Sequence, residues 1–537
     1  MFTTTTPRFE KFADFLAYIE DSFIFTPGAF DNNGIHNHAD ENLGAQKVFA
    51  YAHMKKLSSR DTLQLFCEHY KAVMDNPKGK DHRNIREFMR GGWGGVSGEF
   101  MTSGNTLIGK EAALNPDLEK IAFADSGEYL FTKIANKRKA FTTANPNAKL
   151  ISFGIGDISQ PLGKSVVAAA REASVELEDK VFGYGDTEGY DWLRQMIADK
   201  INGFANGGLG IDKSEVFVSS GAKEDTSNFG ANMFRPKKIA VADPAYPVYI
   251  NAHAQMGQLG KQDAKTGAWE NVVYLPMTKE NGFVPELPKQ RPDLIYLCSP
   301  NNPTGAAMTR DQLQVWVDYA LENHSVILFD AAYEAYIADE NIPHSIYEIP
   351  GANQCAVEFG SFSKTHGFTG IRLGWTIVPH ELLVGGRALG KMWQTWQNSH
   401  FNGAGYVNQK MGAAALSPKG VKEAESTISI YRGNAEMILR TLQDANIYSI
   451  GGTNAPYIWF EVPQLPGTKK GEKPDGWEFL DLLLEKAHMV CTPGKGFGPS
   501  GDGWCRFTSF ASPRNTIEGC ARLEEFLLNL RVKTRSK

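Results

Sequence analysis

The sequence has few of the features that mark secreted, membrane or disulfide-rich proteins. Its 537 residues include only six cysteines, which are scattered and form no Cys-x-x-Cys pair. This pattern fits free thiols in a reducing compartment. No apolar run approaches the roughly 20 residues that a membrane-spanning helix needs. The hydroxyl-rich start Met1–Arg8 lacks the apolar core of a secretory signal. We therefore expect a cytoplasmic protein with no membrane partner.

The charge pattern argues against a nucleic-acid partner. The formal net charge is −5, the sequence pI is about 6.2, and basic residues form no long runs. Nucleic-acid-binding domains carry a basic patch or stripe instead. No internal repeat or long low-complexity tract is present, and the chain is too long for one small domain.

Residues from about 8 to 100 have the apolar spacing of helices. The first such run contains Phe9, Phe12, Phe15, Leu16, Ile19 and Phe23. Further helices are predicted over Ala39–Lys56, from Ser58 or Ser59 through Tyr70, and around Ile85–Met89. The sequence therefore predicts an all-α domain over residues 1–100, followed by a linker at 101–120 that contains the small polar run Thr102–Asn105.

From about residue 121 onward, predicted strands and helices alternate. Apolar strands are expected at 239–243, 294–298, 326–330, 356–359 and 373–378, and polar residues follow several of them. Open α/β sheets bind ligands at the carboxyl ends of their strands. Thr309 and Gln312 form a capping-box pattern for one helix. Residues 420–537 predict a small α+β domain beside the larger one.

The most informative segment is Ser361–Gly374, which reads Ser-Phe-Ser-Lys-Thr-His-Gly-Phe-Thr-Gly-Ile-Arg-Leu-Gly. Two hydroxyls, Ser361 and Ser363, precede Lys364, and glycines and Arg372 follow it. Hydroxyls, glycines and an arginine suit a phosphate group. The segment therefore predicts an anion-binding cup beside a reactive lysine.

Four other segments carry related chemistry. In Ser219–Asp225 a strand, a small-residue turn and a helix start follow one another, and helix N-termini favour phosphate. In Ser325–Tyr333 a carboxylate, Asp330, ends a fully apolar strand. The remaining two segments are Asp243–Tyr249 and Cys298–Gly305. Near the C-terminus, Arg506 lies on an alternating strand, and its planar guanidinium suits two-point binding of a carboxylate.

In this order, the segments resemble the class I/II pyridoxal-phosphate aminotransferases of fold type I. Residues from 121 onward are most similar to the LL-diaminopimelate aminotransferase branch, in the strings Glu128–Phe131, Ile155–Ile158, Ser361–Thr376 and Phe401–Ala404. The resemblance implies a large mixed-sheet domain at about 165–415 and a small α+β domain from 121–164 and 416–537. It also implies pyridoxal 5′-phosphate as cofactor, an amino acid and a 2-oxo acid as substrates, and a homodimer.

The resemblance assigns roles to individual residues. Lys364 would bind the cofactor covalently and act as general base, Asp330 would keep the pyridine nitrogen protonated, and Tyr333 would bond the ring oxygen. Further cofactor contacts are implied for Ala222, Lys223, Tyr246, Asn302, Ser361, Ser363, Arg372 and, from the partner subunit, Tyr184. Substrate contacts are implied for Tyr129, Gly156, Arg506 and, from the partner subunit, Asn402.

Two departures from the branch concern specificity. The glutamate that helps to hold the far ammonium of the substrate falls on Thr187, with Asp186 and Glu188 as candidate replacements, and the branch's Ser-Asn pair is replaced by Gly405-Tyr406. The expected reaction interconverts LL-2,6-diaminopimelate and tetrahydrodipicolinate with glutamate and 2-oxoglutarate in lysine biosynthesis. The alternatives are a class I aminotransferase of different specificity and a ligand-sensing regulatory protein on this fold. A plastid location, which fits the branch, is the alternative to the cytoplasm.

The N-terminal block resembles the HopJ-type effector family. The strings that carry this resemblance are Phe25–Phe30, His36–Ala39, Asp81–Arg86 and the Gly-Gly-Trp-Gly run. The resemblance implies no chemistry. Six polar residues could converge into a metal or polar site, but their spacing has no definite ligand pattern, so loop and cap roles are favoured. They are His36, His38, Glu41, His69, Asp81 and His82.

Overall fold

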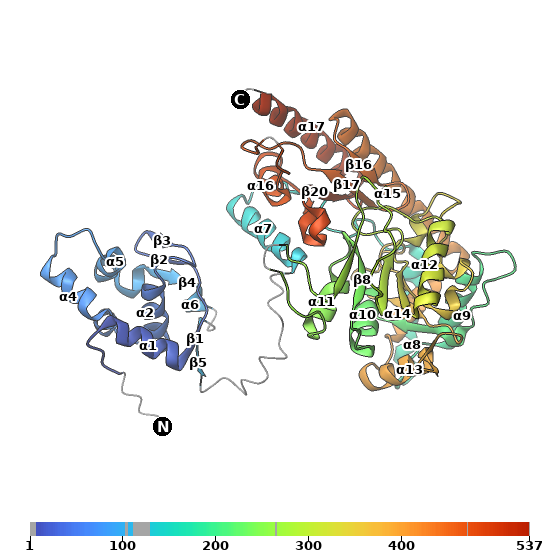
Figure 1. Ribbon diagram of the computed structural model, residues 1–537, viewed down its shortest axis with the longest axis horizontal. Helices are drawn as coiled ribbons and strands as arrows, with labels where there is room; N and C mark the ends of the chain where they lie inside the picture. Colours follow the sequence, from blue (N-terminus) through green and yellow to red (C-terminus); the bar gives the residue numbers. More distant parts are fainter. Residues whose placement is uncertain (1–6, 103–105, 111–128, 264–265, 470, 536–537) are drawn as a thin grey trace. The chain divides into compact units, whose positions relative to one another are not determined.

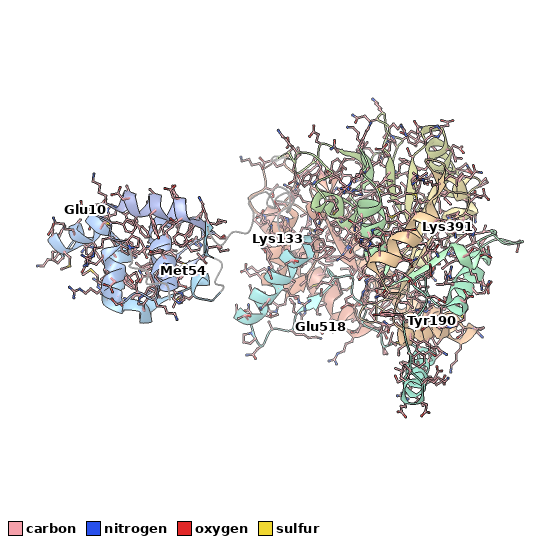
Figure 2. All side chains as sticks on the ribbon, turned by 90° about the horizontal axis from the view of Figure 1, so that it is seen from below. Glu10, Met54, Lys133, Tyr190, Lys391 and Glu518 are labelled. Atoms are coloured by element: carbon pink, nitrogen blue, oxygen red, sulfur yellow. The ribbon has the colours of Figure 1, made fainter. Side chains whose placement is uncertain are left out.

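The computed structural model describes residues 7–102, 106–110, 129–263, 266–469 and 471–535 (Figure 1). The chain divides into two compact units, Met1–Ala122 and Phe123–Lys537. Side chains fill the spaces between the elements of each unit (Figure 2). Most of the predicted linker lies outside the described residues. The proposed division of the second unit at about residues 165 and 415 stays a prediction.

The first unit is mainly helical, with small sheets that the sequence did not predict. Its helices are α1 (Phe12–Ser22), α2 (Leu43–Met54), α3 (Ser59–Gln64), α4 (Cys67–Asp75), α5 (Arg83–Gly91) and α6 (Glu99–Thr102). The strands are β1 (Phe23–Phe25), β2 (Phe30–Asn32), β3 (Ile35–Asn37), β4 (Val96–Gly98) and β5 (Leu107–Gly109). β1 pairs with β5, and β2 pairs with β3 and β4. Strands of three residues are too short to show an alternating pattern, which explains why they escaped prediction.

The helical spacing of the first unit reflects an aromatic core. Phe15, Ile19, Phe49 and Tyr51 are fully buried there. The predicted third helix is two helices, α3 and α4. The first of them is capped by Ser58, whose side chain accepts a hydrogen bond from the backbone N–H of Asp61 at 3.2 Å.

The second unit contains a seven-stranded mixed sheet in the order β7–β13–β12–β11–β10–β8–β9. The strands are β7 (Val216–Ser219), β8 (Ile239–Asp243), β9 (Val272–Pro276), β10 (Leu294–Cys298), β11 (Val326–Asp330), β12 (Ala356–Ser361) and β13 (Gly374–Ile377). β13 is antiparallel to both of its neighbours, and the other pairs are parallel. The predicted strands are therefore confirmed, and they share one sheet.

Both faces of this sheet are covered, which explains why its strands are apolar throughout. In β10, for example, Tyr296 contributes to one core and the adjacent Ile295 and Leu297 to the other. The face of Ile295 packs against α8 (Lys164–Asp179), α9 (Asp191–Asn202), α12 (Arg310–Asn323) and α14 (Tyr406–Leu416). The face of Tyr296 is covered by α10 (Ala222–Ser227), α11 (Val248–Gln255) and α13 (Leu389–His400). The same core continues to α7 (Leu130–Ala144) and α15 (Pro418–Asp444). The predicted capping box at Thr309 is confirmed at the start of α12.

A second, four-stranded sheet is built from the C-terminal part, in the order β16–β17–β20–β19. Its strands are β16 (Ser449–Gly451), β17 (Tyr457–Glu461), β19 (Thr492–Pro493) and β20 (Trp504–Thr508). The long helices α15 and α17 (Pro513–Arg535) pack side by side, and α16 (Gly476–Ala487) contacts α17 and β19 (Figure 1). Two short strands, β6 (Ile151–Ser152) and β18 (Met489–Val490), pair in parallel and bring the segment after α7 to this sheet. Two further short strands, β14 (Leu383–Val384) and β15 (Arg387–Ala388), form a hairpin.

In the part of the chain that the structure describes, no helix is long and apolar enough to cross a membrane.

Candidate active site

A cavity of about 360 Å³ lies at the carboxyl ends of the parallel strands of the seven-stranded sheet. Asp330 ends β11, Ser361 ends β12, and Asn302 follows β10. The residues that line the cavity include most of the predicted site residues. They are Gly156, Ala222, Lys223, Tyr246, Asn302, Asp330, Tyr333, Ser361, Ser363, Lys364 and Arg372. Parallel strands place their carboxyl ends at one edge, so segments distant in the sequence converge here.

Lys364 is placed to act as a nucleophile and as a base. Its Nζ donates to the carbonyl oxygen of Gly156. The pKa of Lys364 is lowered to about 8, mainly by burial and in part by Arg506 and Arg372, whereas Asp157 opposes the shift. An amine with this pKa is neutral far more often at pH 7 than an exposed lysine is.

Asp330 presents a buried carboxyl group to the cavity. Its Oδ2 accepts a hydrogen bond from the Tyr249 hydroxyl at 2.5 Å, and its Oδ1 accepts one from the backbone N–H of Ala332 at 3.0 Å. Burial raises the pKa of Asp330, although both hydrogen bonds oppose the rise. A buried carboxylate is stabilised by a cation close to it, and a protonated pyridine nitrogen is such a cation.

The other end of the cavity collects cations and hydroxyls. Arg372 donates through Nη1 to the Ser363 hydroxyl at 3.3 Å and to the Thr369 carbonyl at 3.2 Å. Burial lowers the pKa of Lys223, and the nearby Arg372 adds to this effect. Arg372 also adopts a φ of +72°, which is rare for a residue with a side chain.

Glycine shapes the same end. Gly221 has a φ of +134°, and a Cβ on it would collide with the Arg372 guanidinium. A Cβ on Gly374 would lie 2.8 Å from the backbone nitrogen of Ala222. The predicted anion-binding cup is therefore formed where the backbone of Gly221 and Ala222 closely approaches that of Gly374, beside the Arg372 side chain. Two like charges close together in a buried place favour an anion such as a phosphate between them.

Arg506 is buried next to the cavity wall, against Asn302, with 1% of its surface exposed. Its Nη1 donates to Oδ1 of Asn302 at 2.6 Å, and its Nη2 donates to the Gly154 carbonyl at 2.8 Å. Its Nε has no acceptor, and no carboxylate of the described residues pairs with this side chain. A buried unpaired guanidinium is costly, so a substrate carboxylate is a suitable partner for it.

Tyr129 and Tyr246 lie near the Arg506 guanidinium. The Lys223 ammonium stands 5.1 Å above the Tyr129 ring, and Tyr246 is half-buried in the cavity wall. Their aromatic faces are suited to stack on a ring or to cover a substrate.

Tyr184 and Asn402 do not reach this cavity. Tyr184 is 90% exposed, and Asn402 is also exposed. The two segments that carry them touch, because a Cβ on Gly403 would lie 2.9 Å from the carbonyl oxygen of Asp186. A role for either residue in a cofactor site therefore requires a second subunit.

The two departures from the LL-diaminopimelate aminotransferase pattern, at Thr187 and at Gly405-Tyr406, lie in these same two segments. Tyr406 packs its ring against Phe182, with centroids 4.4 Å apart, and its hydroxyl donates to Glu176. Glu188 accepts a hydrogen bond from Gln394 at 2.5 Å. No hydrogen bond or ion pair among the described residues involves the Asp186 carboxylate, which is exposed.

Two site residues were missed by sequence reasoning. Tyr249 ends the segment Asp243–Tyr249, three residues after Tyr246, but nothing in the sequence connects it with Asp330. Tyr457, on β17, places its hydroxyl 2.7 Å from that of Tyr333. Only the pairing of β17 with β20 brings Tyr457 beside Arg506.

The predicted polar cluster of the first unit separates into pairs. His36 contacts Asp31 at 2.9 Å, and its ring centroid lies 4.8 Å from that of His38. The His69 and His82 ring centroids lie 4.9 Å apart, with the rings tilted by 39°. Among the described residues, no group of three His, Cys, Asp or Glu side chains could hold a metal ion.

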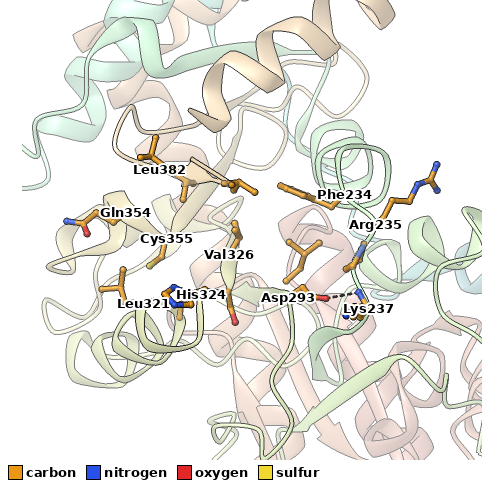
Figure 3. A pocket seen from close by; sticks show the side chains of 17 residues that line it. Phe234, Arg235, Lys237, Asp293, Leu321, His324, Val326, Gln354, Cys355 and Leu382 are labelled. Carbon is orange, nitrogen blue, oxygen red and sulfur yellow. Dashed lines mark hydrogen bonds between the residues drawn. The ribbon is translucent and has the colours of Figure 1, made fainter. Parts of the chain in front are cut away.

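A larger cavity of about 530 Å³ lies at the opposite, amino ends of β10 and β11 (Figure 3). Phe234, His324, Val326 and Leu382 line it, and Asp293 bonds the backbone of Lys237 at 2.6 Å. None of the predicted site residues lies there. The smaller cavity is therefore the candidate active site on chemical grounds, although it is not the larger of the two.

Comparison with known proteins agrees with this choice. Residues 148–523 match the family described as aminotransferase class I and II, and residues 3–102 match the family described as HopJ type III effector protein. The LL-diaminopimelate aminotransferase of Agathobacter rectalis is 46% identical over 413 residues, which cover 76% of this chain and 99% of that protein. The protein of the same name from Methanosphaera stadtmanae is 45% identical over 404 residues, covering 74% and 96%.

Solved structures show the same relationship. The L,L-diaminopimelate aminotransferase from Chlamydomonas reinhardtii superposes with a TM-score of 0.70 at 38% identity, covering 77% of this chain and 98% of that one. From the extent of these matches and the lysine, carboxylate and arginine gathered in one cavity, the chain belongs to the class I and II aminotransferases, in the family of the LL-diaminopimelate aminotransferases.

Proposed function

We propose that the second unit interconverts LL-2,6-diaminopimelate and tetrahydrodipicolinate, with glutamate and 2-oxoglutarate as the other amino and oxo partners, in lysine biosynthesis. The observation that carries this proposal is one cavity that contains a lysine of lowered pKa and a buried carboxylate, with a buried arginine bonded to Asn302 in its wall and paired with no carboxylate of the described residues. The names of its relatives supply the substrate.

The residues present fit pyridoxal 5′-phosphate, on which aminotransferases of this class depend. The cup of Ser361, Ser363, Arg372, Ala222 and Lys223 suits the phosphate, because it gathers hydroxyls, cations and a glycine that admits no Cβ. Asp330 suits the pyridine nitrogen, and Tyr246 suits the ring face. Asn302 and Tyr333 suit the ring oxygen, since their side-chain atoms lie 3.5 Å apart and face the same cavity.

When bound, the cofactor supplies an aldehyde that takes up the amino group and a ring that withdraws electrons. The chain's own residues then do the remaining work. Arg506 holds the α-carboxylate in two-point fashion and so fixes which bond at Cα faces the ring. The Lys364 amine would take the proton from the substrate Cα and deliver it to the carbon of the cofactor's aldehyde group. Asp330 keeps the ring nitrogen protonated throughout.

A second subunit completes the site in this proposal. Tyr184 would contact the phosphate of the partner's cofactor, and Asn402 would contact its substrate. The exposed apolar residues Val181 and Phe182, next to Tyr184, support an interface at this place. Asp186 is the better candidate for the far ammonium of the substrate, because Glu188 is already held by Gln394.

The second candidate function is transamination of a different donor amino acid. Thr187 and Tyr406 favour it, because both depart from the LL-diaminopimelate aminotransferase pattern where these two segments touch. For the compartment we propose the cytoplasm, which agrees with six free cysteines. We propose no activity for the first unit.

The test is a half-reaction on the purified, cofactor-loaded chain. LL-diaminopimelate, glutamate, aspartate and an aromatic amino acid are added separately, and conversion of the cofactor to its aminated form is followed by absorption. We expect fast conversion with the first two, and none in a Lys364→Ala control. Conversion only with other donors would favour the second candidate, a transaminase of different specificity. No conversion with any donor would contradict the proposal that the chain is an enzyme.

A further inference from the structure

Tyr457 lies where the two halves of the proposed site meet. It is on β17 of the four-stranded sheet and is 1% exposed. Its hydroxyl contacts the Tyr333 hydroxyl at 2.7 Å, and its ring lies 4.6 Å from the guanidinium carbon of Arg506. One side chain therefore touches a residue expected at the cofactor's ring oxygen and the residue expected at the substrate's carboxylate.

We propose that Tyr457 is a positioning residue with two separable effects. Its hydroxyl strengthens the hydrogen bond from Tyr333 to the ring oxygen, and its ring holds the Arg506 guanidinium in the orientation that receives a carboxylate. This inference rests on the proposed function, since it takes the roles of Tyr333 and Arg506 from there.

The direction of the hydrogen bond follows from the chemistry of the ring oxygen. Either tyrosine can donate in the contact of 2.7 Å. An anionic ring oxygen can only accept a hydrogen bond. Tyr333 therefore donates its hydrogen bond to the cofactor and must accept one from the Tyr457 hydroxyl. Chains of hydrogen bonds in a low dielectric polarise one another. Donation by Tyr457 therefore makes Tyr333 a better donor.

The ring contact is independent of the hydroxyl. The Tyr457 ring meets the Tyr333 ring edge-on, with centroids 5.0 Å apart at 76°, while its face lies toward Arg506. Phe497, at 4.9 Å, and Phe131, at 5.7 Å, also lie beside the guanidinium. Arg506 has hydrogen-bond partners at Nη1 and Nη2 but none at Nε. Aromatic contacts therefore contribute to its placement.

The alternative is that Tyr457 only fills space. A packing role predicts that loss of the hydroxyl changes stability and leaves the electronic state of the bound cofactor alone. The positioning role predicts a change in the pH at which the visible absorption band of the bound cofactor shifts. When the ring oxygen loses hydrogen-bond donation, it becomes more basic and holds the shared proton to a higher pH.

The experiment compares variants of the full, cofactor-loaded chain. In Tyr457→Phe we expect the midpoint of the band shift to rise by about 0.1 to 0.7 pH unit, which corresponds to roughly 10–30% of a hydrogen bond to a charged oxygen, with KM for glutamate within about twofold of the original. In Tyr457→Leu we expect the same rise and a KM about tenfold higher, because the ring beside Arg506 is lost as well. In a Tyr333→Phe background, Tyr457→Phe should cause no further rise.

Tyr347→Phe is the matched control. Tyr347 is also a buried tyrosine, and its hydroxyl donates to the carbonyls of Ala356 and Ile377, outside the cavity. Its removal should leave the midpoint unchanged. An unchanged midpoint in Tyr457→Phe, or an equal rise in the control, would overturn the inference.

Two further outcomes are distinguishable. If the unaltered chain shows no cofactor band, the proposed function fails rather than the role of Tyr457. If Tyr457→Phe does not hold the cofactor, 3-fluorotyrosine at position 457 keeps the size of the side chain and makes its hydroxyl a stronger donor. The midpoint should then fall, and a rise or no change would overturn the inference.

Discussion

Replacement of Arg506 by lysine tests the proposed carboxylate contact without removing its charge. Arg506 donates from Nη1 to Asn302 and from Nη2 to Gly154, so both outer nitrogens face polar groups at the cavity. A lysine offers a single nitrogen on a flexible stem and cannot bind a carboxylate in two-point fashion. The substitution therefore removes one of two charged hydrogen bonds to the substrate.

The expected size follows from that count. One hydrogen bond to a charged group contributes about 1.5–3 kcal/mol, which corresponds to roughly a 10- to 150-fold change in an equilibrium constant. We expect KM for glutamate in Arg506→Lys to rise by a factor in this range. The cofactor should bind with unchanged affinity, because its proposed phosphate contacts are Ser361, Ser363 and Arg372, whereas Arg506 hydrogen-bonds to Asn302, Gly154 and Thr492.

The assay is the half-reaction at increasing glutamate concentration, with cofactor affinity measured separately by absorption. Arg194→Lys serves as the control, since Arg194 also bonds a backbone carbonyl, that of Val216 at 2.9 Å, but lies outside the cavity. An unchanged KM, or a matching loss of cofactor affinity, would refute the assignment of Arg506 to the carboxylate.

Two other predictions follow from the same geometry. Because the pKa of Lys364 is lowered to about 8, its neutral form is fully present above that pH and is lost below it. The rate at which the cofactor-free chain captures pyridoxal phosphate should therefore rise about tenfold per unit up to pH 8 and then level off, and a midpoint near the ordinary lysine value would contradict the burial argument. The chain, of 59.2 kDa, should sediment as a dimer. Tyr184→Phe should leave the dimer intact but weaken cofactor retention by about tenfold, and a fully active monomer would exclude shared sites.

Sequence alone predicted the candidate site residues that stand at strand ends, because there a short continuous segment carries the relevant residue types. Asp330 closes an apolar strand, and Lys364 follows one within three residues. Contacts between segments that are distant in the sequence were not predictable. The bond from Tyr249 to Asp330 spans 81 residues, and that between Tyr333 and Tyr457 spans 124. Both depend on how elements pack, which periodicity does not encode.

The same limit explains the differences in the first unit. The aromatic spacing predicted its helices, since one apolar face must be buried. β2, β3 and β4 are held instead by backbone pairing, which imposes no recognisable residue pattern on a three-residue segment. The break between α3 and α4 is another local effect, because Cys67 adopts a φ of +49° there.

The charges of the cavity connect binding with basicity. Its cations are Lys223, Lys364 and Arg372, and its carboxylates are Asp157 and Asp330. Arg506, next to the cavity wall, also acts on Lys364. Burial is the main cause of the low pKa of Lys364, but Arg506 and Arg372 lower it further. These arginines are also the proposed partners of the substrate's carboxylate and of the cofactor's phosphate. Each anion that binds therefore offsets a charge that acts against a proton on Lys364.

Lys364 should then be least basic in the empty site, where a neutral amine is needed to capture the cofactor. It should be more basic once phosphate and carboxylate are in place, where the amine must accept a proton from Cα. The two requirements conflict for a lysine of fixed pKa. They are compatible here because the groups that bind the anions are the groups that set the pKa.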